Sequence, residues 1–264
     1  MRLLSKLLAI GVLTLASCGG SDDSPPGPLG KHFDDMFIAD VGMDQKKQVL
    51  DTQQAWSIAK MENAKAEADF NEASAQLTAV KNEQKGTRLA IDTAISNKKQ
   101  AESSADNNRI NAAAKELHAA EALAKAADAR VKYYDAYRNW LKRHWRFTQE
   151  NMYWREAQFE LAKSQLAQKN NKSPKGVDYN WFPSQEQQRG KRVGGAKTKA
   201  DSERQKATSA RETWLKLQEG ADKEAGRPSS LPDPMAPAAA APNPAAAADA
   251  AVAPTAAPAP APAQ

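Results

Sequence analysis

The chain has 264 residues, with 37 lysines and arginines against 32 aspartates and glutamates, a formal net charge of +5 at pH 7, and one cysteine. This small positive excess is not the electrostatic footprint of a nucleic-acid-binding protein, and a single cysteine excludes a fold held by internal disulfides. Helix-favouring residues dominate, above all alanine, whereas β-branched residues are sparse, so we expect an almost wholly helical folded part.

The first residues have the organisation of an export signal. Arg2 and Lys6 flank the start of an apolar run over 7–15, which is far shorter than the roughly 20 residues of a membrane-spanning helix. Leu-Ala-Ser-Cys follows and ends at Cys18. This sequence resembles the lipobox of bacterial lipoproteins, in which a branched apolar residue and two small residues precede a cysteine. The resemblance implies a signal peptide over 1–17, cleavage before Cys18 and lipid attachment to the Cys18 sulfur. The alternative is an ordinary signal peptide in which Cys18 is incidental.

The residue after the cysteine bears on localisation. In enterobacterial lipoproteins, aspartate at this position retains the protein at the inner membrane, so Gly19 favours the outer membrane over the inner membrane of the cell envelope. Several acyl chains anchor a protein stably to a bilayer. Residues 18–30 are rich in proline, glycine, serine and aspartate, which predicts a flexible tether without an apolar face.

Two seven-residue repeats of apolar side chains follow. The repeats have the a/d spacing of coiled coils. They include Val49, Trp56, Phe70, Leu77 and Ile91 in the first, and Ile110, Leu117, Val131, Trp145 and Phe159 in the second. The sequence Ser-Ser-Ala-Asp-Asn-Asn over 103–108 predicts a turn between them, whereas Gly86 is interpreted as a weak point within a continuous helix. We therefore expect helices at 44–102 and 108–169 that form a long antiparallel coiled-coil hairpin.

A third helix and a tail complete the predicted architecture. Prolines and glycine interrupt the helical pattern over 170–183, and a heptad pattern returns over 185–220. A third helix that runs back along the second would reach about Tyr137 and place Trp214 near Tyr137 and Trp140. We expect a three-helix, aromatic base and a thin, alanine-lined two-helix tip over about 75–130. The helical domain would then span 31–220, and the Pro/Ala-rich residues 221–264 would form a disordered tail.

The sequence contains no catalytic constellation. His32, His118 and His144 lie far apart, and none has a second metal ligand at helical spacing. No phosphate-binding loop, dinucleotide fingerprint or nucleophile elbow is present. We expect a non-enzymatic protein without a metal or cofactor.

Two surfaces are candidates for binding. Basic residues cluster on the second helix, and aromatic residues lie in the interruption before the third; the candidate residues are Arg138, Lys142, Arg143, Arg146, Tyr179, Trp181 and Phe182. In one interpretation these residues contact peptidoglycan or anionic lipid. In the other they form a solvated helix face, on which long basic side chains cover apolar rings. Polar residues at predicted seam positions, namely Asn63, Arg138, Arg155 and Glu203, either set the helix register or turn outward to solvent.

The combined features predict a lipid-anchored envelope protein that acts as a coiled-coil scaffold, spacer or adaptor. Its membrane contact would be the lipid at Cys18, and its protein partner would bind the coiled-coil tip. The alternative is an envelope glycan- or lipid-binding module that uses the aromatic and basic base. Neither hypothesis involves nucleic acid.

Overall fold

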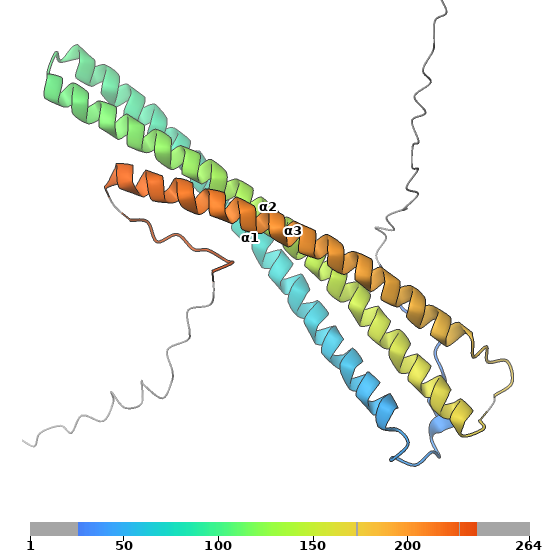
Figure 1. The fold of residues 1–264 in the computed structure, drawn as a ribbon. Coiled ribbons are helices and arrows are strands. Elements are labelled where there is room, and N and C mark those ends of the chain that lie inside the picture. Colours follow the sequence, from blue (N-terminus) through green and yellow to red (C-terminus); the bar gives the residue numbers. More distant parts are fainter. Residues whose placement is uncertain (1–25, 173, 227, 237–264) are drawn as a thin grey trace, which may run out of the picture.

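The computed structural model describes residues 26–172, 174–226 and 228–236. This part of the chain contains a short 3-10 helix, η1 (Asp35–Ile38), and the long helices α1 (Lys47–Ser103), α2 (Asn107–Lys169) and α3 (Trp181–Ala225), with no β-strand (Figure 1). The prediction of an all-α fold is confirmed. With 57 residues at about 1.5 Å per residue, α1 alone is roughly 85 Å long.

The helices α1 and α2 lie side by side and antiparallel. Near one end of the pair, the rings of Trp56 and Phe159 stack with centroids 5.7 Å apart. Near the other, the Asn97 amide donates a 3.3 Å hydrogen bond to Glu116. The turn between the helices lies where the sequence predicts it. The Asp106 side chain fixes the start of α2, because it accepts hydrogen bonds from two backbone amides of the first turn. The helix α1 also continues through Gly86 as expected.

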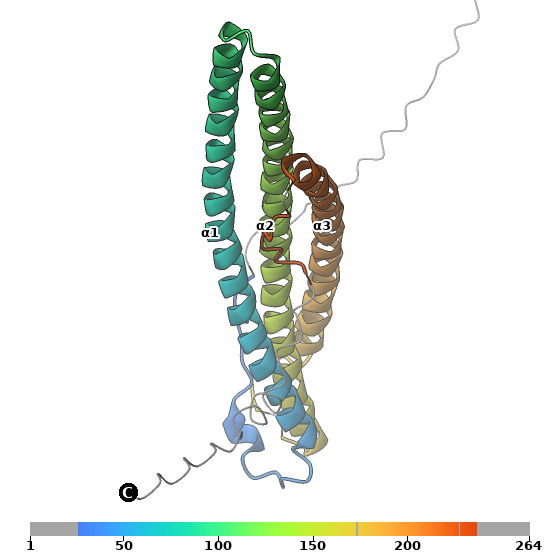
Figure 2. The same cartoon turned by 90° about the vertical axis from the view of Figure 1, so that its left-hand side faces the viewer.

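The predicted three-helix base is present in part, because side chains of all three helices meet in two buried clusters, one around Phe33 and one around Trp214. The helix α2 packs against both α1 and α3, but no Cα atom of α1 lies within 8 Å of one in α3 over the described residues. Figure 2 shows α2 between the other two helices. The backbones of α1 and α3 thus stay apart, and large side chains of α2 such as Tyr133 and Phe159 fill the space between them.

The third helix is longer than predicted at both ends. Pro183 was expected to lie before the helix, but it is the third helical residue, where the backbone nitrogen needs no intrahelical partner. At the other end, α3 continues to Ala225 and stops at Gly226, whose φ of +66° gives the left-handed cap that glycine adopts without strain. Residues 221–225, expected in the tail, are thus helical.

The greater length of α3 changes what it covers. Trp214 stacks on Tyr133, with centroids 5.3 Å apart, instead of lying beside Trp140. Near its end, α3 brings Glu224 within 3.2 Å of His118. The two-helix part beyond this contact, which we call the tip, spans about 95–117 rather than the predicted 75–130. Within the tip, the buried residues are the small Ala101 and Ala113.

Two segments predicted to be free of the helices pack on them. Residues 26–41, which we call the N-terminal segment, bury Leu29, Phe33, Ile38 and Val41. Residues 228–236, which we call the strap, turn back from the end of α3 and contact α2 near Tyr133. The prediction of a flexible tether is therefore wrong for 26–30, and that of a disordered tail is wrong for the strap. Residues 237–264 lie outside the described part.

Candidate functional site

The candidate lipid-attachment site lies outside the described residues. Cys18 precedes the first described residue, Pro26, by eight positions. An eight-residue stretch spans at most about 29 Å when fully extended. The place where Pro26 leaves the helices therefore limits where a lipid on Cys18 would hold the molecule.

A buried pair of opposite charges fixes the N-terminal segment to α2. Glu160 and Lys163 are 3% and 4% exposed, and their side chains form an ion pair of 2.9 Å. The Glu160 carboxylate accepts a 2.6 Å hydrogen bond from the backbone N–H of Phe33, and Lys163 donates to the carbonyl oxygen of the same residue at 2.8 Å. Both charges are thus paired with each other and with the backbone of one residue. Breaking such a pair leaves an uncompensated buried charge, so the arrangement is specific.

Further contacts hold the N-terminal segment on both sides of Phe33 along the chain. Arg189 of α3 donates two 3.0 Å hydrogen bonds to the carbonyl oxygen of Gly27, and Lys172 pairs with Asp40 at 2.5 Å. Glu156, which is buried, has its pKa raised above the ordinary value because burial disfavours its charged form. Together these contacts hold the N-terminal segment against the half of the molecule that lies away from the tip.

The predicted basic residues are engaged with neighbours on the helices. Arg146 pairs with the buried Glu150 at 3.0 Å, and Arg192 of α3 contacts the same carboxylate at 2.9 Å. Arg138 pairs with Asp135 at 3.6 Å and stands over the ring of Phe70. Arg138 and Arg146 thus act as packing residues, as in the structural interpretation of this cluster.

The remaining two basic residues line a polar pocket. Lys142 and Arg143 of α2, with Asn139 and with Glu203 of α3, surround a space of about 360 Å³. Lys142 is exposed and Arg143 is partly buried. Two cations and two other polar groups around one pocket suit a polar or anionic ligand.

The predicted aromatic residues are not part of this pocket. The Phe182 ring packs edge-on against Phe33 at 5.9 Å and against Trp181 at 5.2 Å, and Tyr179 lies 6.1 Å from Phe33. Their shared neighbour Phe33 is hydrogen-bonded to Glu160 of α2. Glu160 lies 14 residues, or about 21 Å of helix, from Arg146 of the basic cluster. They fold back onto the helices as expected, but as core residues. The structure therefore divides the predicted binding patch into two places.

The polar seam residues also have partners in the structure. Asn63 accepts a 3.3 Å hydrogen bond from Thr148 across the α1–α2 interface, so it contributes to the pairing of these helices. Arg155 stands over the Trp154 ring, and Glu203 pairs with Lys206 at the surface of α3. Only Asn63 thus has a contact of the kind that sets register.

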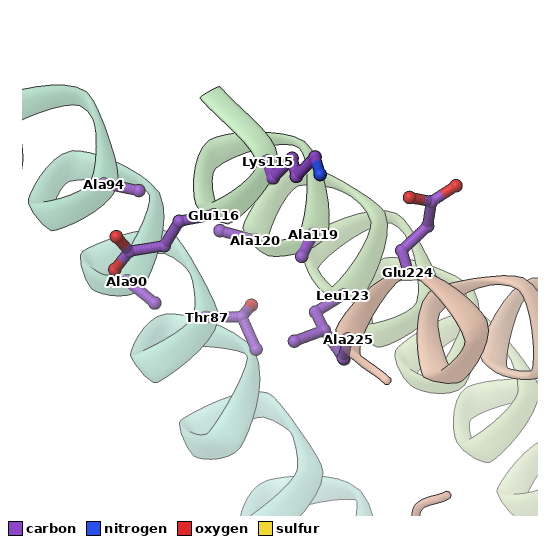
Figure 3. A pocket seen from close by; sticks show the side chains of 10 residues that line it. All are labelled: Thr87, Ala90, Ala94, Lys115, Glu116, Ala119, Ala120, Leu123, Glu224 and Ala225. Atoms are coloured by element: carbon purple, nitrogen blue, oxygen red, sulfur yellow. The ribbon is translucent and has the colours of Figure 1, made fainter. Parts of the chain in front are cut away.

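A second pocket lies where α3 ends beside the tip. It has a volume of about 510 Å³, and all three helices contribute to it. Figure 3 shows its side chains, namely Thr87, Ala90, Ala94, Lys115, Glu116, Ala119, Ala120, Leu123, Glu224 and Ala225. Small apolar residues form most of the lining and three charged residues complete it, as at sites that receive an apolar side chain of a partner. We call this the tip pocket.

Glycine shapes the contact between α2 and α3. A Cβ atom at Gly190 would lie 3.2 Å from Nε1 of Trp154, so glycine allows α3 to approach this indole closely. The indole N–H donates a 2.8 Å hydrogen bond to Glu186 one turn earlier. The packing of α3 on α2 therefore requires a glycine at this position.

Sequence reasoning missed the charged residues that hold the N-terminal segment. Glu156, Glu160 and Lys163 are spaced by three and four residues, a pattern that places them on one helix face, yet charged residues with this spacing are usually exposed. Leu29 and Phe33 are apolar but belong to no repeat. This pair is the signal that could have indicated a segment packed on the helices.

The chain matches no known family model, and no curated protein or solved structure shows significant similarity to it. Over the described residues, no helix has the length and apolar character needed to cross a bilayer. The same residues contain no cluster of three or more potential metal ligands.

Proposed function

We propose that this protein is a non-enzymatic lipoprotein of the cell envelope, anchored by a lipid on Cys18, in the outer membrane rather than the inner one. It acts as a scaffold or adaptor, in which α1 and α2 form a coiled-coil hairpin that presents its tip to a protein partner. The observation that carries the proposal is the fixed N-terminal segment. A chain tied to a membrane needs such an attachment if its orientation is to be defined.

The position of this attachment separates anchor and tip. Leu29, through Glu156, and Phe33, through Glu160, are attached to α2 near its C-terminal end. From Glu156 to the start of α2 at Asn107 there are 49 residues, or about 74 Å of helix. The stretch between Cys18 and Pro26 spans at most about 29 Å. A lipid on Cys18 therefore holds the half of the molecule away from the tip and leaves the tip far from the attachment point.

The tip pocket supports the role of the tip in partner binding. The walls contributed by α1 and α2 are mainly alanine, and Ala90 is exposed. Apolar contact surface surrounded by charge is typical of the centre and rim of protein interfaces. A partner that inserts an apolar side chain here would bury area that α3 leaves uncovered.

A charge placed in the pocket tests this function. We expect Ala90→Glu to reduce capture of the partner in cells by at least tenfold, as measured by chemical cross-linking and mass spectrometry. The matched control is Leu89→Glu, since Leu89 is 67% exposed and does not line the pocket. The adaptor function is wrong if Ala90→Glu captures the same partners as the native chain.

The polar pocket favours a second candidate function, binding of an envelope glycan or anionic lipid. The observation that favours it is the presence of Lys142 and Arg143 at one pocket, with Lys142 exposed. Sedimentation with peptidoglycan sacculi and with anionic vesicles would measure this binding. Lys142→Glu combined with Arg143→Glu should abolish it, whereas Arg146 must be left intact because it pairs with buried Glu150. Absence of binding by the native chain excludes this candidate.

A further inference from the structure

A buried arginine lines two adjoining cavities near the middle of α2. Arg130 is 5% exposed, and it borders one cavity of about 230 Å³ and another of about 200 Å³. Val80 and Glu83 of α1 border both cavities too, so the two spaces share a boundary. The strap forms part of the outer wall, with Pro232 and Pro234 at the first cavity and Leu231 at the second.

The guanidinium group of Arg130 is only partly satisfied. Its Nη1 forms an ion pair with Glu83, but among the described residues its buried Nε has no hydrogen-bond partner. Its side chain is 6% exposed, whereas that of Glu83 is 57% exposed. An unpaired buried donor costs about 1–3 kcal/mol. The glutamate can move into water without such a cost, and the arginine would then need another acceptor.

Two further unpaired polar atoms lie close by. Gln76, which lines the larger cavity, has a buried side-chain oxygen without a donor. The Trp214 ring lies 6.0 Å from the Arg130 guanidinium carbon, and its buried indole nitrogen also has no partner. Native proteins satisfy nearly all buried polar atoms, so three unsatisfied atoms around one place are groups that a bound ligand or water would satisfy.

The lining defines the chemistry of this partner. The exposed surface of the walls is mainly apolar, with side chains such as Ala79, Val80 and Leu123. The remaining charged lining residue, Asp233, already accepts hydrogen bonds from Arg211 and Tyr133. The spaces are too small for a peptide strand, and the strap already covers them. An apolar chain with one anionic group fits, because the guanidinium pairs with the anion and the chain fills the cavities. A carboxylate fits better than a phosphate, since a doubly charged group costs more to desolvate.

We propose that these cavities bind a medium-chain fatty acid, whose carboxylate accepts a hydrogen bond from Nε of Arg130 and replaces Glu83 as its ionic partner. The acyl chain lies between α1, α2 and the strap. This site is separate from the tip pocket, and it does not depend on the adaptor function.

Isothermal titration with octanoate tests the proposal, with octanol as the uncharged probe. The full chain carries Cys18→Ser so that no attached lipid competes. We expect one octanoate per chain, bound at least tenfold more tightly than octanol. Arg130→Met should remove this preference, whereas Lys132→Met, which removes an exposed charge two residues away, should leave it unchanged.

A second variant retains the arginine and decides the matter if Arg130→Met does not fold. Glu83→Gln removes the competing carboxylate, so we expect octanoate to bind at least threefold more tightly, with exposed Glu67→Gln as the matched control. Equal affinity for octanoate and octanol, or no binding of either, overturns the proposal. So does an octanoate affinity that Glu83→Gln leaves unchanged or weakens.

Discussion

The two ends of this molecule are held together by different means. Away from the tip, three helices and the N-terminal segment meet around Phe33, with buried charges such as Glu160 and Lys163 paired inside the protein. At the tip, two helices meet through small side chains, and the polar contact between Asn97 and Glu116 is exposed. Buried alanine removes little apolar area from water, at about 25 cal/mol per Å². The most extensive core and the proposed partner-binding site therefore lie at opposite ends.

Removal of one buried charge should have the largest effect. We expect Glu160→Ala to lower the free energy of unfolding by about 3 kcal/mol, because buried Lys163 keeps only the exposed Asp35 as an ionic partner and the Phe33 amide loses its acceptor. Urea unfolding measures the loss. The matched control, Glu67→Ala, removes an exposed carboxylate and should change stability by less than about 0.5 kcal/mol. Equal stabilities of the two variants would show that the N-terminal segment contributes little.

The strap should contribute less. The Asp233 carboxylate accepts hydrogen bonds of 2.6 Å from the Tyr133 hydroxyl and from Arg211. We expect Asp233→Asn to cost about 1–2 kcal/mol, since the charge-assisted bond to arginine is weakened. Hydrogen exchange of the Met235 amide should accelerate at the same time, because this N–H donates to Tyr133 and Asp233. Asp201→Asn, at an exposed pair on α3, is the control, and an unaltered Met235 amide would contradict the assigned role of the strap.

A change at the tip should remain local. Ala94→Gly is expected to weaken α1 by about 1 kcal/mol. Hydrogen exchange should accelerate within about 90–117, while amides of α2 beyond Glu150 keep their native rates. Faster exchange along the whole of α2 would show that tip and base unfold as one unit.

The smallest expected effect depends on pH. Because burial raises the pKa of Glu156 in the folded protein, its ionisation costs more there than in the unfolded chain, and stability from this group falls as the pH rises above the ordinary value of 4.5. We expect Glu156→Gln to stabilise the protein at pH 7 by at most about 1 kcal/mol, with no gain at pH 3.5. Thermal unfolding at both pH values provides the measurement. A variant less stable at pH 7 than the native chain contradicts this assignment.

The accuracy of the sequence prediction differs between regular and irregular segments. The apolar repeats locate α1 and α2 within a few residues because each repeat reflects one continuous interface, and the cap at Asp106 has a local signature. The length of α3 was underestimated because Pro183 is acceptable in a first turn as well as before a helix. The N-terminal segment and the strap have no repeat, and their positions depend on contacts with residues about 100 or more positions away, such as Phe33 with Glu160 and Asp233 with Tyr133.

The same limit applies to the candidate sites. The basic cluster is visible in the sequence, but only tertiary contacts show that Arg146 pairs with buried Glu150 and that Lys142 and Arg143 line a pocket. No sequence pattern distinguishes Arg130 from the other basic residues of α2. It is buried beside the strap and Trp214, which lie far from it in the sequence.

The proposed function depends most directly on attachment of the N-terminus to a membrane. Cells that produce the chain with Cys18→Ser should be fractionated and the membranes washed at high salt, with Ser17→Ala as a control that keeps a small residue before the cysteine. We predict that the native chain and Ser17→Ala stay with the outer membrane after the wash, whereas Cys18→Ser is released. Retention of Cys18→Ser in the washed membranes would contradict the account.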